Sequence, residues 1–342
     1  MEDDLVMYNM PSERRSGAGL LLDTLEGPIR QALLGWALDS GVFDLCETFI
    51  LPDALARRMD LPPPQLLLTL RALVAADFMQ TDGGRFRTAP DILPFVAKDS
   101  PRNMVATLRS MADMRHAGLN DIGTLIASAT HGGNTRLFDD THWDASYLSL
   151  AAFHRSVAAD AMIPCLTSLP EWPDTQNLLE IGPGSAVLAR RLLALRPDLS
   201  ITLFDLPPVI ERIAEEAADL PLSLVPGSYN GALPGKCFDV IWCSMTLYFH
   251  DQGLPALICR LAEHLAPGGV LLSFHEALTD DRTAPPEHVI GRLMPGLRQR
   301  DVSFAEGEIA EAMTAAGLRR PSSDRLSTPF GRFRLDAARK EA

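Results

Sequence analysis

The stretch NLLEIGPGSAV, residues 177–187, decides the fold of this chain. Its first five residues are typical of a buried strand, and a helical pattern follows from Val187 to Leu195. Between the two lie Gly182 and Gly184, which let a ligand approach the backbone closely because glycine has no side chain. The amino terminus of the helix offers free N–H groups to that ligand. The stretch therefore predicts a strand–turn–helix unit with a nucleotide-type site at the turn.

An acidic residue stands at the end of a second predicted strand. Residues 199–204 are mostly apolar, and Asp205 follows them, 25 residues after Glu180. A carboxylate at this place can accept hydrogen bonds from the hydroxyl groups of a ribose. The dinucleotide-binding pattern G-x-G-x-x-G would need its third glycine at Val187, so a hydride-transfer enzyme is disfavoured.

Three motifs together resemble those of one enzyme family. The pattern E-x-G-x-G-x-A at residues 180–186 resembles the first motif of class I S-adenosylmethionine (SAM) methyltransferases. With FDLP at 204–207 and APGG at 266–269, the resemblance extends over nearly the whole chain to the small-molecule O-methyltransferases that carry an N-terminal winged-helix dimerisation domain. It implies a doubly wound, Rossmann-like α/β sheet that binds SAM, preceded by a mainly α-helical domain.

The resemblance also implies which residues surround the cofactor. The first-motif residues would approach the methionine part of SAM, Asp205 would bind the ribose, and Ser228 and Tyr229 would flank the adenine, where the family often has Asp followed by Phe or Met. Ser244 is added because it lies near the end of a predicted strand. The predicted cofactor site is Glu180, Gly182, Gly184, Asp205, Leu206, Ser228, Tyr229 and Ser244.

The chain departs from the family pattern at the catalytic base. In the O-methylating members, a His followed by Asp and Trp comes after the fourth strand and removes the proton of the acceptor hydroxyl. Counting back from Pro267 without a gap places Leu247 at the His position, and leucine cannot act as a base. A shift of three residues places His250 and Asp251 on the pair instead. A neutral imidazole near pH 7 suits proton removal, so His250 could act as the base in the shifted alignment. Both alignments stay open.

The two alignments imply different acceptors. With His250 as the base, the expected reaction is methylation of a hydroxyl oxygen on a small molecule. Without a base, a thioether sulfur could attack the methyl group directly, as in relatives that S-methylate 4-methylthio-2-hydroxybutyrate on the route to dimethylsulfoniopropionate. Other relatives bind SAM without methylating. The candidate acceptor contacts are His154, Arg155, His275 and Met294. No metal is expected, because no group of His, Cys, Asp and Glu has metal-ligand spacing.

The first half of the chain is predicted to form a winged-helix-like module. Helical segments over 52–59 and 65–76 precede a hairpin signal at 78–87 with Asp-Gly-Gly at its turn. The second helix has one basic residue, Arg71, on a nearly continuous apolar surface, which favours packing over DNA binding. We expect residues 1–100 to form a dimerisation domain, 101–165 interdomain helices that contact the substrate, and 166–342 the SAM domain, with the acceptor pocket between the parts.

Length and composition limit the number of domains and the kinds of partner that we expect. The 342 residues fit two domains of ordinary size. A net charge of −13 repels phosphate backbones and anionic lipids, so nucleic acid and membranes are not expected partners. The 5 cysteines form no C-x-x-C pair, and no apolar run approaches the roughly 18 residues of a membrane span. We therefore expect a cytoplasmic protein with reduced thiols. The family resemblance further implies a homodimer that acts on a small molecule.

Overall fold

The computed structural model describes residues 17–128, 140–235 and 237–342. By its internal contacts the chain divides into two compact units, Met1–Asn103 and Met104–Ala342. The helices that were expected to form a separate segment over 101–165 thus belong, for the most part, to the second unit. No helix among the described ranges has both the length and the apolar character needed to cross a bilayer.

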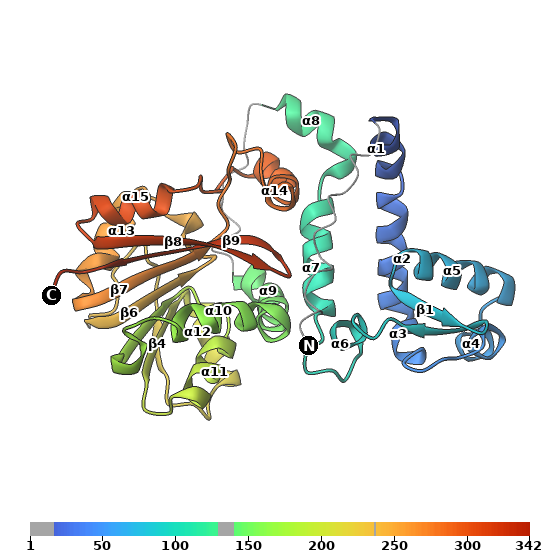
Figure 1. Ribbon diagram of the computed structural model, residues 1–342, viewed down its shortest axis with the longest axis horizontal. Helices are drawn as coiled ribbons and strands as arrows, with labels where there is room; N and C mark the ends of the chain where they lie inside the picture. The colour runs from blue at the N-terminus through green and yellow to red at the C-terminus, as the bar shows by residue number, and fades with distance from the viewer. Residues whose placement is uncertain (1–16, 129–139, 236) are drawn as a thin grey trace, which may run out of the picture. The chain divides into compact units, whose positions relative to one another are not determined.

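The first unit is mainly helical and contains one small hairpin (Figure 1). The hairpin pairs β1 with β2 in antiparallel register, Met79 opposite Thr88, and its turn contains Gly83 and Gly84, both with positive φ. Only glycine adopts such angles without strain, which is why the Asp-Gly-Gly signal predicts this turn. The elements are α1 (Gly17–Thr24), α2 (Gly27–Ser40), α3 (Val42–Leu45), α4 (Pro52–Met59), α5 (Pro63–Ala75), β1 (Met79–Asp82), β2 (Arg85–Thr88) and α6 (Leu93–Val96).

Helix α5 illustrates how the core of this unit forms. Its buried residues Leu66, Leu70 and Leu73 recur at intervals of four and three, so they lie on one face of the helix. That face packs with Phe43 and Leu55 into one apolar cluster. One face of the helix that would have to enter a DNA groove therefore belongs to the core, while Leu68 outside that face is 69% exposed.

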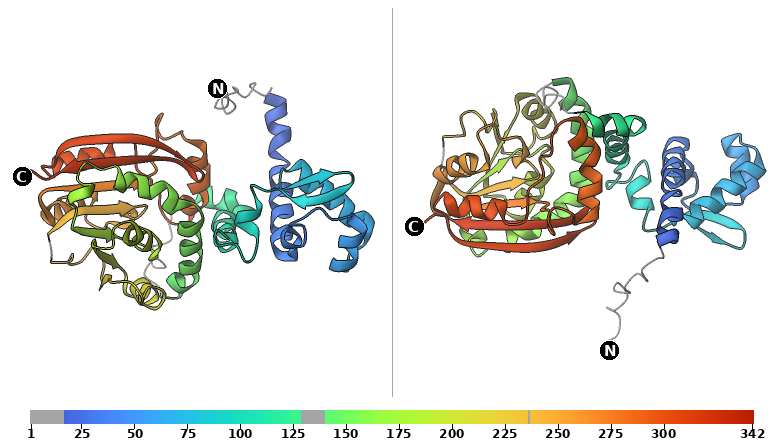
Figure 2. Two further views of the ribbon diagram at one scale, coloured as in Figure 1. Left: turned by 60° about the horizontal axis from the view of Figure 1, so that its bottom comes forward. Right: turned by 90° about the horizontal axis from the view of Figure 1, so that it is seen from above.

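The second unit begins with helices and continues into a sheet (Figures 1 and 2). The helix α9 continues without a break into a short π-helical turn, η3, and then into α10. Such π-turns inside α-helices are frequent at functional sites. The helical elements before the sheet are α7 (Val105–His116), η1 (Leu119–Asp121), α8 (Ile122–Ala127), α9 (Asp140–Phe153), η3 (His154–Ala158), α10 (Ala159–Thr167) and η4 (Trp172–Asp174).

The sheet has seven strands in the order β5-β4-β3-β6-β7-β9-β8. The strands from β5 to β7 are parallel, whereas β9 pairs with β7 and β8 in antiparallel register. The strands are β3 (Asn177–Ile181), β4 (Ser200–Asp205), β5 (Ser223–Pro226), β6 (Phe238–Ser244), β7 (Leu265–His275), β8 (Arg319–Thr328) and β9 (Gly331–Arg339). The connecting helices are α11 (Val187–Leu195), α12 (Pro207–Glu216), η5 (Leu247–Phe249), α13 (Leu254–Glu263), α14 (Pro286–Arg298) and α15 (Glu308–Ala315).

Both faces of the sheet are covered by apolar clusters. Side chains alternate along β3, so Leu178 belongs to the cluster that includes α10, α11 and α12, and Leu179 to the cluster that includes α13 and α15. This confirms the predicted doubly wound α/β fold. The chain runs outward from β3 through β4 to β5 and then returns to β6 on the other side of β3. Ligands of open α/β sheets bind at such a reversal, outside the carboxyl ends of the strands.

Candidate functional site

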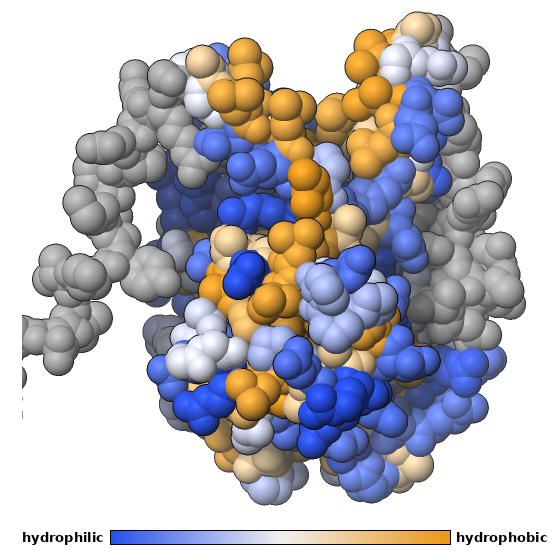
Figure 3. Space-filling model, turned by 90° about the vertical axis from the view of Figure 1, so that its right-hand side faces the viewer, coloured by the Kyte–Doolittle hydropathy of each residue, from blue (hydrophilic) through white to orange (hydrophobic). Residues whose placement is uncertain are grey.

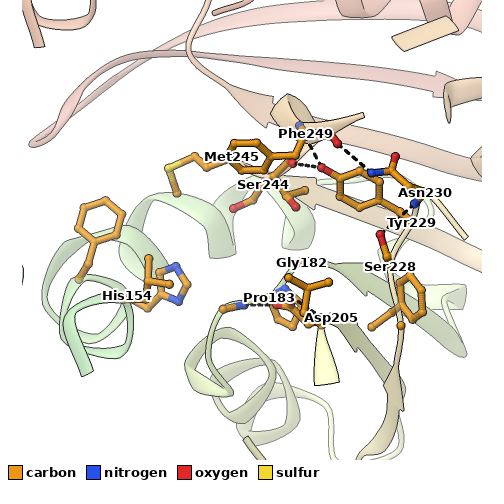
Figure 4. Close-up of a pocket in the computed structure, with 17 residues that line it drawn as sticks. His154, Gly182, Pro183, Asp205, Ser228, Tyr229, Asn230, Ser244, Met245 and Phe249 are labelled. Carbon is orange, nitrogen blue, oxygen red and sulfur yellow. Dashed lines mark hydrogen bonds between the residues drawn. The ribbon is translucent and has the colours of Figure 1, made fainter. Parts of the chain in front are cut away.

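A cavity lies at the carboxyl ends of β3, β4 and β6, in the second unit. Residues of α9 and η3 cover it from the other side (Figure 4). Every residue of the predicted cofactor site except Glu180 lines this cavity. The lining residues are Leu150, Phe153, His154, Gly182, Pro183, Gly184, Phe204, Asp205, Leu206, Gly227, Ser228, Tyr229, Asn230, Ser244, Met245, Thr246 and Phe249.

The glycine turn after β3 is shaped by close packing at one of its two glycines. Gly182 and Gly184 both have a φ of +63°, a conformation that side chains rarely adopt. A Cβ on Gly182 would lie 2.0 Å from Oγ1 of Thr246. A Cβ on Gly184 would meet Leu150 at 3.4 Å, which is an ordinary contact. The chain therefore has no room for a side chain at Gly182, while Gly184 faces the cavity with space beside it.

Asp205 holds this turn from the neighbouring strand. Its Oδ2 accepts a hydrogen bond from the backbone N of Gly184 at 3.0 Å, and its Oδ1 accepts one from the backbone N of Leu206 at 2.7 Å. Burial raises the pKa of Asp205 to about 6, against the opposing effect of these two N–H donors. The carboxylate lines the cavity between the glycine turn and Ser228 (Figure 4), so it can accept hydrogen bonds from a ribose bound there.

Glu180 lies behind the cavity, in β3. It is 4% exposed, and its Oε2 has no hydrogen-bond partner. Burial, and then the nearby charge of Asp205, raise the pKa of Glu180 to about 8. An uncompensated buried carboxylate is costly when it is ionised, so Glu180 is protonated near neutral pH in the protein without ligand.

Replacing Glu180 by glutamine should stabilise the ligand-free protein at alkaline pH. Because its pKa is about 8 in the folded chain and 4.5 ordinarily, the folded state binds the proton more tightly, and this contribution to stability is lost as the pH rises from 4.5 through 8. Urea unfolding should show Glu180→Gln to be more stable than the parent by roughly 1–4 kcal/mol at pH 9, and nearly equal to it at pH 5.

The matched control is Glu263→Gln, an exposed residue at the end of α13. It should change the free energy of unfolding equally at both pH values. If Glu180→Gln and the parent differed in free energy of unfolding by the same amount at both pH values, the raised pKa of Glu180 would be contradicted.

His154 closes the cavity from the helical side (Figure 4). Its Nδ1 lies 2.7 Å from Oγ of Ser185, the residue after the glycine turn, so η3 is fastened to that turn. Burial lowers the pKa of His154 to about 4, which keeps the imidazole neutral. Arg155 lies elsewhere: its guanidinium is 4.0 Å from Glu216 in an exposed ion pair, and it does not line the cavity.

The loop after β6 presents Phe249 to the cavity, and neither His250 nor Asp251 is among the described lining residues. Leu247 is fully buried in the core. Burial and then Arg300 lower the pKa of His250, and the other charges that act on it are those of Glu308 and Asp251. Phe249, which takes the position of the family's Trp in the alignment without a gap, lines the cavity.

Two other candidate acceptor contacts also lie outside the cavity. His275 is 1% exposed at the end of β7, and its Nε2 accepts hydrogen bonds from the backbone N of Thr246 at 3.0 Å and of Leu247 at 3.1 Å. Met294 is buried in α14, where it packs beside Gly118. Of the four predicted acceptor contacts, the structure brings only His154 to the cavity.

Sequence reasoning missed several lining residues. Met245 and Thr246 carry no motif, and only the fold places them opposite the glycine turn. A signal did exist for Phe249, since it takes the Trp position in the alignment without a gap. Next to it, the Tyr248 hydroxyl donates to Glu276, which also pairs with Arg292, so these side chains support the loop from behind. Within the described ranges, no three His, Cys, Asp or Glu residues are grouped closely enough to hold a metal ion.

Comparisons with known proteins find similarity to methyltransferases. Residues 178–269 match the family model described as "Methyltransferase domain". The chain is 25% identical to demethylspheroidene O-methyltransferase of Rhodobacter capsulatus, over 95% of this chain and 83% of that protein. It is 23% identical to the N,N-dimethyltransferase OxyT of Streptomyces rimosus, over 89% and 91%. Human N-acetylserotonin methyltransferase, solved in complex with SAM, has the same fold with a TM-score of 0.77, 19% identity and coverage of 97% and 100%.

Proposed function

We propose that this chain, which is a class I SAM-dependent methyltransferase, transfers the methyl group of SAM to a heteroatom, most directly a hydroxyl oxygen, of a small-molecule acceptor. The observation that carries the proposal is the cavity in which Asp205 and the Gly182 turn meet at the carboxyl ends of neighbouring strands. Support for oxygen comes from the names of relatives such as the demethylspheroidene enzyme. The name of OxyT supports nitrogen as the second candidate.

The residues of the cavity fit the parts of SAM in order. Tyr229 and Ser228 would flank the adenine, Asp205 would accept hydrogen bonds from the ribose, and the glycine turn would admit the methionine part. Figure 4 shows Ser228 and Tyr229 toward one end of the cavity and His154 toward the other, with Asp205 and Gly182 between them. When bound, SAM supplies an electrophilic methyl group on a sulfonium. The role of the chain is then to orient that group and the acceptor and to exclude water.

The wall beside the methionine end is apolar. Leu150 and Phe153 of the helical cover and Met245 and Phe249 of the loop after β6 line the cavity there. Such a wall favours an acceptor with an apolar body that positions its nucleophile by packing. None of these four described residues carries a carboxylate or an imidazole, and the neutral His154 beside them is bonded through Nδ1 to Ser185. An acceptor that ionises readily, or a thioether or amine with a free lone pair, suits this wall best.

The experiment that tests the proposal is incubation with SAM labelled in its methyl group and a panel of phenols, hydroxy acids, amines and thioethers. Label should pass to at least one acceptor, and its position identifies the heteroatom. Calorimetry with SAM alone measures cofactor binding independently of transfer, so it identifies the alternative of a protein that binds SAM but does not methylate. Measurable SAM binding without a labelled product from any class would contradict the proposed transfer.

Replacing His250 by alanine decides between the two alignments. Because Phe249 and not His250 faces the cavity, His250→Ala should keep at least about half of the parent's turnover with the acceptor found above. The matched control is His264→Ala, which removes another half-buried imidazole of the same unit, at the end of α13. A loss of about 100-fold in kcat for His250→Ala alone would restore His250 as the general base.

The expected homodimer is proposed from the surface of the first unit. Exposed leucine and isoleucine side chains follow one another from α1 to the start of α2: Leu21 in α1 is 72% exposed, Leu25 between the helices 70%, and Ile29 in α2 62%. Figure 3, seen from the side of these helices, shows apolar surface gathered in a band. Apolar surface of this kind marks an interface more often than a free face. Light scattering must give twice the mass of one chain, and a monomer would contradict the proposal.

A further inference from the structure

The loop between β6 and α13 is held by two side chains. One is His275 at the end of β7, and the other is Tyr229 in the segment after β5. The loop residues Thr246–Phe249 form no regular ladder, so their backbone groups need other partners. The imidazole of His275 accepts hydrogen bonds from the backbone N of Thr246 and of Leu247. The hydroxyl of Tyr229 donates to the backbone O of Thr246 at 2.8 Å and accepts from the backbone N of Phe249 at 3.1 Å. Two side chains thus hold four backbone groups of one turn.

Tyr229 differs from His275 because it also lines the cavity. Figure 4 shows its ring along one side of the cavity and its hydroxyl bonded to the loop. The adjacent Asn230 adds a third tie, donating from Nδ2 to the backbone O of Phe249 at 2.9 Å. One short segment after β5 therefore contacts the expected adenine position and fixes the loop at the same time.

The loop in turn shapes the other half of the cavity. Met245 lines it from a backbone with a φ of +49°, which is unfavourable for a residue with a side chain and persists only where the surroundings impose it. Thr246 packs against Gly182 so closely that no Cβ fits between them. A shift of this loop would therefore move the wall at the methionine end and leave the ring of Tyr229 beside the adenine.

We propose that Tyr229 is a positioning residue for methyl transfer: its hydroxyl couples the adenosine half of the cavity to the loop Met245–Phe249, which holds the methionine half. The proposal rests on SAM occupying this cavity. The ring of Tyr229 contributes to binding adenosine, whereas the hydroxyl contributes only to the geometry of the loop. The two contributions can be separated because Tyr229→Phe keeps the ring and removes the hydroxyl.

The test compares the binding of SAM with that of 5′-methylthioadenosine, which keeps the adenosine part. Calorimetry should show that Tyr229→Phe weakens SAM binding about five- to tenfold, since two backbone groups lose their partner. The same variant should bind 5′-methylthioadenosine, which lacks the amino-acid end, within about twofold of the parent. Equal weakening of both ligands, or no weakening of SAM, would overturn the proposal. Failure of the parent to bind SAM would instead contradict the cofactor assignment, so the two failures are distinguishable.

Amide hydrogen exchange measured by NMR gives a second, ligand-free readout. In Tyr229→Phe the Phe249 amide should exchange at least about tenfold faster, while the Thr246 and Leu247 amides, bound by His275, stay slow. The matched control is Tyr147→Phe, which removes a hydroxyl that donates to Glu216 outside the cavity. This control should leave the loop amides and the ratio of the two affinities unchanged. Unchanged Phe249 exchange in Tyr229→Phe would overturn the proposal.

Discussion

Replacing Gly182 by alanine is expected to reduce SAM affinity by about 100-fold or more. The added Cβ would lie 2.0 Å from Oγ1 and 2.8 Å from Cβ of Thr246, and the second of these atoms cannot rotate away. The turn, or the loop that contains Thr246, must then move, and both line the cavity. A φ of +63° adds about 1–2 kcal/mol for any residue with a side chain. Calorimetric titration with SAM, on protein whose fold is checked by circular dichroism, measures the loss.

Gly184→Ala is the matched control, because both glycines have the same φ, whereas a Cβ on Gly184 would meet Leu150 at an ordinary 3.4 Å. Its main cost is that of the backbone conformation, so it should weaken SAM binding no more than about tenfold. The double variant Gly182→Ala with Thr246→Gly removes the colliding atoms and should recover part of the affinity. If Gly182→Ala and Gly184→Ala prove equally harmful, the close packing on Thr246 is not what excludes a side chain at Gly182.

Replacing Asp205 by alanine should weaken SAM binding by about 100-fold. The variant loses an acceptor for the ribose hydroxyls, and hydrogen bonds to a charged group are worth about 1.5–3 kcal/mol each. It also releases the backbone N of Gly184, which Asp205 holds at 3.0 Å, so the glycine turn loosens. Calorimetry at pH 8 measures the effect. A dissociation constant equal to that of the parent would remove Asp205 from the cofactor site.

The same carboxylate makes SAM affinity depend on pH. Because its pKa is about 6 without ligand, and ribose hydroxyls bond best to the ionised form, protons compete with SAM as the pH falls through 6. The parent should bind SAM about tenfold more weakly at pH 5 than at pH 8. Asp205→Asn keeps the shape but cannot ionise, so its weaker affinity should vary little over this range. A parent whose affinity is constant from pH 5 to 8 would contradict the raised pKa.

Much of the candidate site could be predicted from the sequence because its parts lie at the ends of strands. Gly182 follows β3, Asp205 ends β4 and Ser244 ends β6, each marked by a local pattern. The carboxyl ends of parallel strands meet at one edge of a sheet, so the three are brought together by any fold of this class. Ser228 and Tyr229 came from the resemblance, and they too line the cavity.

The candidate acceptor contacts were harder to predict, since the type of a residue does not tell which way its side chain points. His275 ends an apolar strand, the usual place for a ligand contact, yet its side chain turns inward and accepts hydrogen bonds from two backbone N–H groups. Arg155 is next to His154 in sequence, but successive residues of the η3 turn point in different directions, so the guanidinium faces Glu216 instead. Such choices depend on partners from distant elements.

By itself the sequence determined the α/β class and the strand–turn–helix site, because these depend on patterns within a few residues and on rules common to all parallel sheets, and its resemblance to a known family indicated the cofactor. Only the tertiary structure brought Phe249 to the cavity, left Glu180 without a hydrogen-bond partner for its Oε2, and placed the Tyr229 hydroxyl on the loop after β6. The physical reason is that burial and hydrogen-bond partnership are set by packing between elements far apart in the chain, which no local pattern encodes.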